Sequence, residues 1–330
     1  MKINKVKISG VGLGVPEKIM TNFDLEKIVN TTDEWIQQRT GIKERHVSDE
    51  QTATSDICIK AAQDAIRMSG ISKDEIDFIL VGTVTPDYFF PSTAGVVQKA
   101  LGIEKGAILD IEAGCSGFLY TLAIARRFVM LGNNYRNVLA IGAETLTKII
   151  NWEDRNTCVL FGDGAGAAVV SVSDDDSEIL SDALSGDGSI GNFLIMPGGG
   201  SRNPVSQKVL DEKLATIHME SGREIFKNAV VSMTDMAVKV LEDANISADQ
   251  VDWVIPHQAN IRIMEGVINK LGVPREKLIV NLEKYGNTSA GSIPIALTEF
   301  VENGKIKKGD IVLLTAFGAG FTSAGTLIRW

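Results

Sequence analysis

Three side chains of this 330-residue chain could together perform acyl transfer, and the first is a cysteine. Cys115 lies in the motif Gly114-Cys115-Ser116-Gly117, directly before a stretch that is apolar on nearly every helical face. A cysteine at a helix N-terminus can act as a thiolate nucleophile toward carbonyl groups, because free N–H groups and the helix dipole stabilise negative charge there. Free cysteines are also common as small buried core residues. The motif alone leaves both interpretations open.

The other two candidates are a histidine and an asparagine. His257, in "VDWVIPHQAN", follows a predicted strand and precedes a predicted helix, the position where α/β proteins usually place their sites. His46 and His218 have no such context and are interpreted as structural or exposed. Asn287, in "GNTSAG", is equally suited to a turn or a helix cap. A thiol with two hydrogen-bond donors becomes an acyl-transfer site only where the scaffold makes them converge.

An internal duplication supplies such a scaffold. The segment "GISKDEIDFILVGT" (70–83) matches "NISADQVDWVIPHQ" (245–258) at an offset of 175 residues. Each copy follows a helix-like segment and runs into an apolar, β-rich segment typical of a buried strand. Downstream, Cys115 follows Gly102 by 13 residues and Asn287 follows Gly272 by 15. Cys115 and Asn287 are therefore expected at equivalent corners of two related halves.

The repeated order of helix and strand predicts an α/β fold with helices between and outside two sheets. The acidic run at 171–178, "SVSDDDSE", is typical of a solvated loop and marks the expected boundary. We expect an N-terminal half, residues 1–172, that carries the cysteine. The C-terminal half, residues 173–330, carries the histidine and the asparagine.

Composition excludes several other classes of protein. The net charge of −9 and a pI near 5.0 argue against a general nucleic-acid binder. No apolar run of about 18 residues predicts a membrane span, and the strand-like N-terminus lacks the apolar core of a signal peptide. Three cysteines are too few for a disulfide framework and favour the cytoplasm. No spacing matches a metal site, and the glycines at 10–14 and 198–200 lack phosphate-loop spacing.

The chain as a whole resembles the β-ketoacyl-acyl carrier protein synthase III family, the initiating condensing enzymes of bacterial fatty acid synthesis. The resemblance extends from "KISGVGLGVP" to the C-terminal "GTLIRW". It rests on the segments "TTDEWIQQRTGIKERH" (31–46), "FPST" (90–93), "GCSGF" (114–118), "FGDGAGAAV" (161–169), "PHQANIRI" (256–263), "GNTSAGSIP" (286–294) and "FGAGF" (317–321).

The resemblance implies a thiolase fold, a duplicated five-layered α-β-α-β-α architecture, assembled as a homodimer. It implies an acyltransferase in which Cys115 takes an acyl group from acyl-CoA and malonyl-acyl carrier protein then supplies an enolate after loss of CO2. His257 and Asn287 would hydrogen-bond the enolate oxygen, and the backbone N–H groups of Cys115 and Ala319 would form the oxyanion hole. Ala319 stands where family members can have glycine, which leaves the backbone donor in place. Coenzyme A is then a substrate, and no tightly bound cofactor and no metal are implied.

The same resemblance assigns binding residues. Trp35 and Arg155 would sandwich the adenine of coenzyme A, a stacking that indole and guanidinium groups favour. The remaining assignments are Thr31, Arg39, Gly222 and Asn260 along the pantetheine and phosphate path, Lys227, Arg262 and Lys270 toward the acidic carrier protein, and Phe90 at the partner subunit's acyl pocket.

Related families fit less well. Hydroxymethylglutaryl-CoA synthases pair cysteine and histidine with a glutamate, elongating synthases have a second histidine where this chain has Asn287, and chalcone-type synthases lack "GNTSAG" and "PHQANIRI". Two alternatives stay open: a condensing enzyme of secondary metabolism, and an inactive structural partner subunit. The sequence does not identify the acyl-CoA primer, because the insertion-like segment 198–222 is expected near the pocket entrance.

Overall fold

The computed structural model describes residues 3–132 and 134–330 and contains two large mixed sheets. The first sheet has the strand order β1 (Val6–Gly14), β7 (Asp163–Val172), β6 (Asn137–Thr145), β4 (Phe78–Gly82) and β5 (Ala107–Ile111). The second has the order β11 (Trp253–Pro256), β12 (Ile311–Gly318), β13 (Thr322–Arg329) and β8 (Glu178–Gly186). β4 runs parallel to β6 as β11 does to β12, and the next two strands in each sheet are antiparallel. The predicted α/β duplication is thus confirmed strand by strand.

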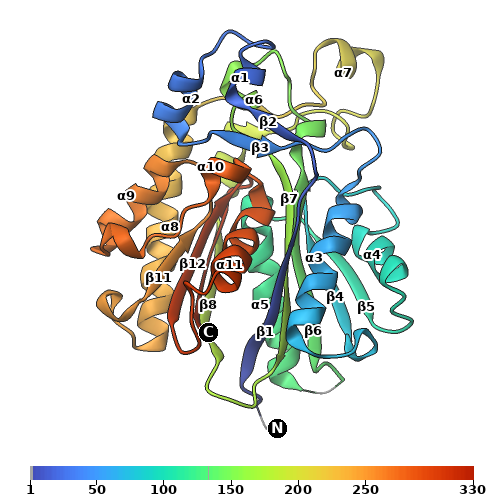
Figure 1. Cartoon of the computed structure of the whole chain (residues 1–330). Coiled ribbons are helices and arrows are strands. Elements are labelled where there is room, and N and C mark those ends of the chain that lie inside the picture. The colour runs from blue at the N-terminus through green and yellow to red at the C-terminus, as the bar shows by residue number, and fades with distance from the viewer. Residues whose placement is uncertain (1–2, 133) are drawn as a thin grey trace.

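Helices cover both faces of each sheet, which explains why the central strands are apolar along their whole length rather than alternating. The five residues of β4 are all buried, and so are eight of the nine in β6. α5 (Gly117–Leu131) and α11 (Ser292–Glu302) lie between the sheets. α3 (Thr54–Ser69) and α4 (Thr93–Leu101) cover the outside of the first sheet, and α8 (Gly222–Ala244) and α9 (Ile261–Leu271) that of the second (Figure 1). These are the five layers of the thiolase fold.

Shorter elements lie toward the upper end of the molecule in Figure 1. They are β2 (Ile19–Thr21), β3 (Glu44–His46), α1 (Asn22–Leu25), α2 (Asp33–Thr40), α6 (Arg155–Cys158), β9 (Leu194–Ile195), α7 (Gln207–Asp211), β10 (His218–Met219) and α10 (Leu282–Tyr285). The segment 198–222 contains α7 and β10, and α7 projects from this end as a separate loop (Figure 1).

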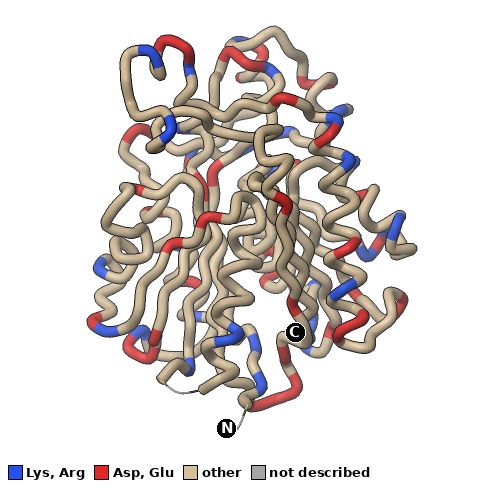
Figure 2. The backbone as a smooth tube through the Cα atoms, turned by 180° about the vertical axis from the view of Figure 1, so that it is seen from behind, with Lys and Arg blue, Asp and Glu red and all other residues tan. Residues whose placement is uncertain are grey.

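Charged residues lie mainly on the outer helices and loops, where acidic and basic groups are interspersed (Figure 2). Among the described residues, no helix has the length and apolar character needed to cross a membrane. Within the same residues, no group of three or more His, Cys, Asp or Glu side chains is placed to hold a metal ion.

Candidate active site

Cys115 lies in a single turn of 3-10 helix, η2 (Gly114–Ser116), between β5 and α5. Gly114 has a φ of +52°, and a Cβ atom there would lie 2.7 Å from the backbone nitrogen of Ala319. A Cβ atom on Gly318 would lie 2.6 Å from the backbone nitrogen of Cys115. Glycine is therefore required at both positions, because the turn of the first half touches the β12–β13 turn of the second.

The surroundings of Cys115 differ from those of the other cysteines. Cys115 is partly exposed, whereas Cys58 and Cys158 are fully buried. Burial raises the pKa of Cys115 to about 11, against the lowering effect of hydrogen bonds from the Ser289 side chain and from the backbone N–H groups of Ala319 and Cys115 itself. The backbone N–H groups lower the pKa as a helix N-terminus should, and desolvation outweighs them. The thiol is protonated at neutral pH and has donors in place for a negative charge.

His257 follows β11 and is 3% exposed. Its backbone N–H donates to Thr315 O at 2.8 Å, and its ring Nδ1 lies 2.7 Å from Ser292 Oγ. Ser292 Oγ also accepts from the backbone N–H of Gln258 at 3.3 Å, so its own proton is available to Nδ1. This arrangement favours the tautomer with the proton on Nε2. Burial lowers the pKa of His257 to about 3, so the ring is neutral near pH 7 and Nε2–H can donate.

Asn287 lies before the 3-10 turn η7 (Ser289–Gly291) and is also buried. Its Oδ1 accepts from the Ser289 backbone N–H at 2.9 Å. Its own backbone N–H donates to Leu160 O at 2.9 Å, which ties the loop to the first half. Because Oδ1 is occupied, the Nδ2 group of Asn287 is the end free to donate.

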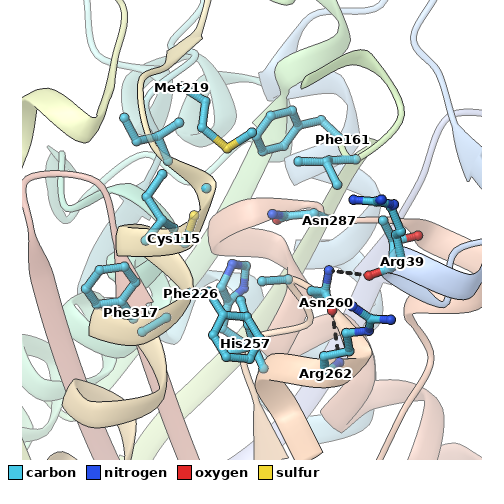
Figure 3. A pocket seen from close by; sticks show the side chains of 18 of the residues that line it. Arg39, Cys115, Phe161, Met219, Phe226, His257, Asn260, Arg262, Asn287 and Phe317 are labelled. Atoms are coloured by element: carbon cyan, nitrogen blue, oxygen red, sulfur yellow. Dashed lines mark hydrogen bonds between the residues drawn. The ribbon is translucent and has the colours of Figure 1, made fainter. Parts of the chain in front are cut away.

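All three predicted side chains line one cavity of about 520 Å³, and the structure brings them together from three separate segments (Figure 3). The rest of the cavity wall is largely apolar, and much of it comes from residues that we did not select as candidates in the sequence. They include Phe161, Leu194, Met219, Phe226, Met233 and Phe317. Phe226 and Met233 are seven residues apart on α8, a spacing that is equally typical of helix core packing. Their role in the cavity required the tertiary structure.

Four predicted coenzyme A residues, Trp35, Arg39, Gly222 and Asn260, also line this cavity. Asn260 caps α9 through Oδ1, which accepts from the Arg262 backbone N–H at 2.9 Å, and its Nδ2 donates to Arg39 O at 2.8 Å (Figure 3). The Asn260 side chain therefore connects α9 to α2, and both helices line the cavity.

Two guanidinium groups lie over the Trp35 ring. The Cζ atoms of Arg155 and Arg39 lie 4.7 Å and 4.8 Å from its ring centroid. Arg155 is outside the cavity lining, and its Nη1 donates to Asn30 O at 3.0 Å. Thr31 is also outside the lining, and its Oγ1 is buried without a hydrogen-bond partner among the described residues. Because a guanidinium lies directly on the indole, a base stacked there would displace it.

The remaining predicted residues are more dispersed. Arg262 lines the cavity from the first turn of α9, and Lys270, at the other end of α9, lines a separate shallow groove. Lys227 is on α8, outside the cavity lining. Phe90 is 87% exposed in the loop after β4 and does not line this chain's cavity.

Glu144, at the end of β6, is an ionisable group that we did not select from the sequence. It is fully buried and accepts hydrogen bonds from Thr85 Oγ1 at 2.7 Å and from the Val84 backbone N–H at 3.1 Å. Burial raises its pKa to about 8 despite these donors. The sequence signal that could have identified Glu144 is an acidic residue inside the apolar strand segment "LAIGAET".

We predict that Glu144→Gln removes a pH dependence of folding stability between pH 6.5 and pH 8. The raised pKa means that the folded chain keeps a proton that the unfolded chain loses near pH 4.5, so this stabilisation is complete below pH 4.5 and is lost as the pH rises through about 8. His257 is neutral in the folded chain but half protonated in the unfolded chain at pH 6.5, so it adds a small opposite slope that is the same in the wild type and in Glu144→Gln. Relative to the variant, the wild-type free energy of unfolding should fall by roughly 1.5 kcal/mol over this interval.

Urea unfolding at pH 6.5 and pH 8 measures this difference. Glu104→Gln, at an exposed position, removes one negative charge and should leave the wild-type slope unchanged. An equal slope in the wild type and in Glu144→Gln would contradict the prediction.

Comparisons with known proteins agree on one family. The model described as "3-Oxoacyl-[acyl-carrier-protein (ACP)] synthase III" matches residues 109–188, and its C-terminal counterpart matches residues 241–330. A β-ketoacyl-[acyl-carrier-protein] synthase III from Caldanaerobacter subterraneus subsp. tengcongensis is 54% identical over 323 residues, which cover 98% of this chain and 97% of that protein. One from Campylobacter fetus subsp. fetus is 49% identical, with 99% of each chain covered.

Solved structures give the same result. The 3-oxoacyl-[acyl-carrier-protein] synthase III of Aquifex aeolicus VF5 superposes with a TM-score of 0.91 at 47% identity and covers 98% of this chain and 100% of its own. The priming β-ketosynthase of the R1128 polyketide biosynthetic pathway superposes with a TM-score of 0.91 at 31% identity and covers 99% and 97%.

Proposed function

The chain belongs to the 3-oxoacyl-[acyl-carrier-protein] synthase III family, and from this premise we propose that it primes fatty acid synthesis through an acyl-Cys115 thioester. The reaction joins an acyl-CoA primer to malonyl-acyl carrier protein and gives 3-oxoacyl-acyl carrier protein, coenzyme A and CO2. One observation carries the proposal: a cysteine, a buried histidine and a buried asparagine from three separate segments line one largely apolar cavity.

In the first half-reaction, the Cys115 sulfur attacks the thioester carbon of acyl-CoA. A C–S bond to the enzyme forms, the C–S bond to coenzyme A breaks, and the thiol proton ends on the sulfur of coenzyme A. The carbonyl oxygen becomes negative in the transition state, and in this proposal the N–H groups of Cys115 and Ala319 stabilise it. The apolar cavity wall suits a bound acyl chain.

In the second half-reaction, malonyl-acyl carrier protein loses CO2, and the bonding electrons form an enolate. Nε2–H of His257 and Nδ2–H of Asn287 donate to the enolate oxygen. A neutral histidine suits this role, because it donates without needing a counterion in a buried site. The enolate carbon then attacks the acyl thioester and releases the Cys115 thiolate, which takes up from solvent the one proton that the overall reaction consumes.

For coenzyme A, we propose that the adenine enters between Trp35 and Arg155, with Thr31, Arg39, Gly222 and Asn260 along the rest of the path. The guanidinium groups on the indole support a flat cationic stacking site. We further propose that Lys227, Arg262 and Lys270 meet the acidic carrier protein, with Arg262 nearest the cavity.

We propose a homodimer in the cytoplasm. The exposed Phe90 supports a role in closing the partner subunit's acyl pocket, and the edge strand β5 presents the exposed side chains Ile108 and Leu109. Three free cysteines fit a reducing compartment. The halves 1–172 and 173–330 are proposed as the two duplicated units, joined by the linker between β7 and β8.

We predict that Trp35→Ala raises KM for acyl-CoA about tenfold, because stacking of a base on an aromatic ring is worth roughly 1–3 kcal/mol. The value of kcat for condensation should change little, since the adenine is far from the bonds that react. Steady-state kinetics with varied acyl-CoA measure both constants. Trp152→Ala removes an indole that is not in the cavity lining and should leave KM unchanged. A fall in kcat at constant KM would show that Trp35 acts in the chemical steps and not in the binding of acyl-CoA.

Intact-protein mass spectrometry tests the proposed function. The enzyme is mixed with acetyl-, propionyl-, isobutyryl- or longer acyl-CoA and then with malonyl-acyl carrier protein. An acyl adduct on Cys115 that disappears as 3-oxoacyl-carrier protein forms is the expected result, and it identifies the primer.

A synthase III-like condensing enzyme of secondary metabolism is the second candidate, favoured by the likeness to the R1128 priming ketosynthase. An acyl adduct that persists with malonyl-acyl carrier protein and is released by another acceptor would support the secondary-metabolism enzyme. If no acyl-CoA gave an adduct, both condensing-enzyme proposals would be overturned, and an inactive structural subunit would be favoured.

A further inference from the structure

Asn287 is held in the cavity wall by a segment of the first half, residues 159–162, which directly follows α6. Its backbone N–H donates to Leu160 O at 2.9 Å, and its backbone oxygen accepts from the Gly162 N–H at 3.1 Å. Phe161 and Asn287 therefore form a parallel β-bridge between the two halves, and both residues line the cavity (Figure 3). The place of the Asn287 amide in the cavity thus depends on the place of the segment 159–162.

The side chain of Arg45, on β3, packs against both strands of this bridge. A Cβ atom built on Gly162, directly after Phe161, would lie 2.9 Å from the Cβ atom of Arg45. A Cβ atom built on Gly286, directly before Asn287, would lie 3.2 Å from the same atom. The absence of side chains at these two glycines is therefore what lets Arg45 contact both segments at the bridge.

The guanidinium group joins the start of the segment to a fixed asparagine. Its Nη2 donates to Val159 O at 2.8 Å, and its Nη1 donates to Asn22 Oδ1 at 2.9 Å. The Nδ2 group of Asn22 donates in turn to Ile42 O at 2.8 Å and to Asp33 Oδ1 at 2.9 Å. Because both ends of the Asn22 amide have partners, its orientation is set, and the planar guanidinium group spans a fixed gap between Asn22 and Val159.

Arg45 is fully buried, and no carboxylate hydrogen-bonds it in the described part of the chain. Its acceptors there are two backbone carbonyl oxygens and the Asn22 amide oxygen, and its Nε has no partner. Burial lowers the pKa of Arg45 to about 10, so the side chain keeps its charge near pH 7. A buried charge without a counter-charge costs free energy of folding. Stabilisation by an ion pair therefore does not explain this arginine, whereas its contacts with the Asn287 bridge give it a task.

We propose that Arg45 is a positioning residue for Asn287, because it holds the segment 159–162 where the Asn287 backbone needs it. Arg45 acts through the Val159 carbonyl group and the two glycines, and it has no contact with substrate in this proposal. The inference deepens the proposed role of Asn287 in decarboxylation and rests on it.

The first test is hydrogen–deuterium exchange of the backbone N–H groups of Gly162 and Asn287, followed by mass spectrometry of the peptides that contain them. Arg45→Met keeps an unbranched apolar chain against the two glycines and removes every donor of the guanidinium group. Exchange at both positions should become about tenfold faster, because the loss of the hydrogen bond to Val159 O loosens the bridge.

Arg126→Met is the matched control. Arg126, on α5, also donates to a backbone carbonyl group, Leu180 O at 3.2 Å, and to the carboxylate of Asp182, and it lies outside the cavity lining. This variant loses hydrogen bonds of the same kind at a distant place. It should leave the exchange of the bridge and both half-reactions at their wild-type rates.

The second test measures the two half-reactions separately. In Arg45→Met, CO2 release from malonyl-acyl carrier protein should fall roughly tenfold, since a displaced donor stabilises the enolate less well. Acylation of Cys115 should stay within about twofold of the wild-type rate, because that step does not use the Asn287 amide. In Arg45→Lys, which keeps the charge and lacks the planar fork, CO2 release should fall about threefold.

A double-mutant cycle with Asn287→Ala shows whether Arg45 acts through Asn287. In the Asn287→Ala background, Arg45→Met should cause no further fall in CO2 release. A purely structural role would instead lower both half-reactions together, through a smaller folded fraction.

Three results would overturn the proposal: equal falls of both half-reactions in Arg45→Met, the full fall repeated in the Asn287→Ala background, or unchanged exchange at Gly162 and Asn287. If Arg45→Met does not fold, Arg45→Lys decides, because wild-type exchange and wild-type CO2 release in that variant contradict the role of the fork. Exchange is measured without acyl-CoA. Failure of the proposed function, seen as no acyl adduct on the wild-type enzyme, is therefore distinguishable from failure of this inference.

Discussion

The Cys115→Ala variant should form no acyl-enzyme with any acyl-CoA, and its rate of condensation should fall by roughly 10⁴-fold or more. The reason is that the methyl group of alanine has no electron pair with which to attack the thioester, and Cys58 and Cys158 are buried away from the cavity. The small change of volume at a partly exposed position should leave the fold intact. Intact-protein mass spectrometry and a condensation assay measure the two losses.

The same variant should still release CO2 from malonyl-acyl carrier protein, because His257 and Asn287 remain in place to stabilise the enolate. Cys158→Ala is the matched control, since it removes one thiol from a fully buried site outside the cavity lining. Normal condensation by Cys115→Ala would show that another group carries the acyl chain.

The second large effect concerns the two side-chain donors. His257→Ala and Asn287→Ala should each lower the rate of decarboxylation by about 10²- to 10³-fold, the loss typical of removing one preorganised donor to a developing oxyanion. Acylation of Cys115 should stay measurable in both variants, because the backbone N–H groups of Cys115 and Ala319 serve that step. Release of CO2 and formation of the acyl adduct, followed separately, give the two rates.

Controls for these variants come from the same residue types. His218→Ala removes a histidine on β10 that contacts Lys213 O and does not line the cavity. Asn303→Ala removes an asparagine directly after α11. Both controls should decarboxylate at the wild-type rate. Normal condensation by His257→Ala would contradict the proposed enolate stabilisation.

Much of this architecture could be predicted from the repeat. The offset of 175 residues places β4 against β11 and the turn η1 (Lys73–Glu75) against η5 (Ala248–Gln250), and the structure has these elements at those positions. Local signals sufficed because β4 and β11 are continuous apolar runs and the helices that follow the repeat end at glycines, α4 at Gly102 and α9 at Gly272. The corners at Cys115 and Asn287 follow from the same alignment.

The cavity wall and the environments of Glu144 and Cys115 could not be predicted, because they depend on contacts between segments that are distant in the chain. Phe161 and Phe317 look like core residues in the sequence, and only the packed halves turn them toward a cavity. Glu144 is one acidic residue in a strand, and its buried hydrogen bond with Ser289 joins positions that are 145 residues apart in the chain. The pKa of Cys115 also resisted prediction, since the helix position was visible in the sequence and the extent of desolvation was not.

The contacts of Gly114 with Ala319 and of Gly318 with Cys115 make the nucleophile a reporter of complete folding. The turn that presents Cys115 belongs to the first half of the chain, and the strand that ends beside it belongs to the second, so neither half alone can hold the sulfur against the Ala319 N–H. During refolding, the reactivity characteristic of this thiol would arise only when both halves have docked. Thiol labelling in time would then measure the docking step itself, with Cys58, whose core cluster contains only residues of the first half, marking the folding of that half.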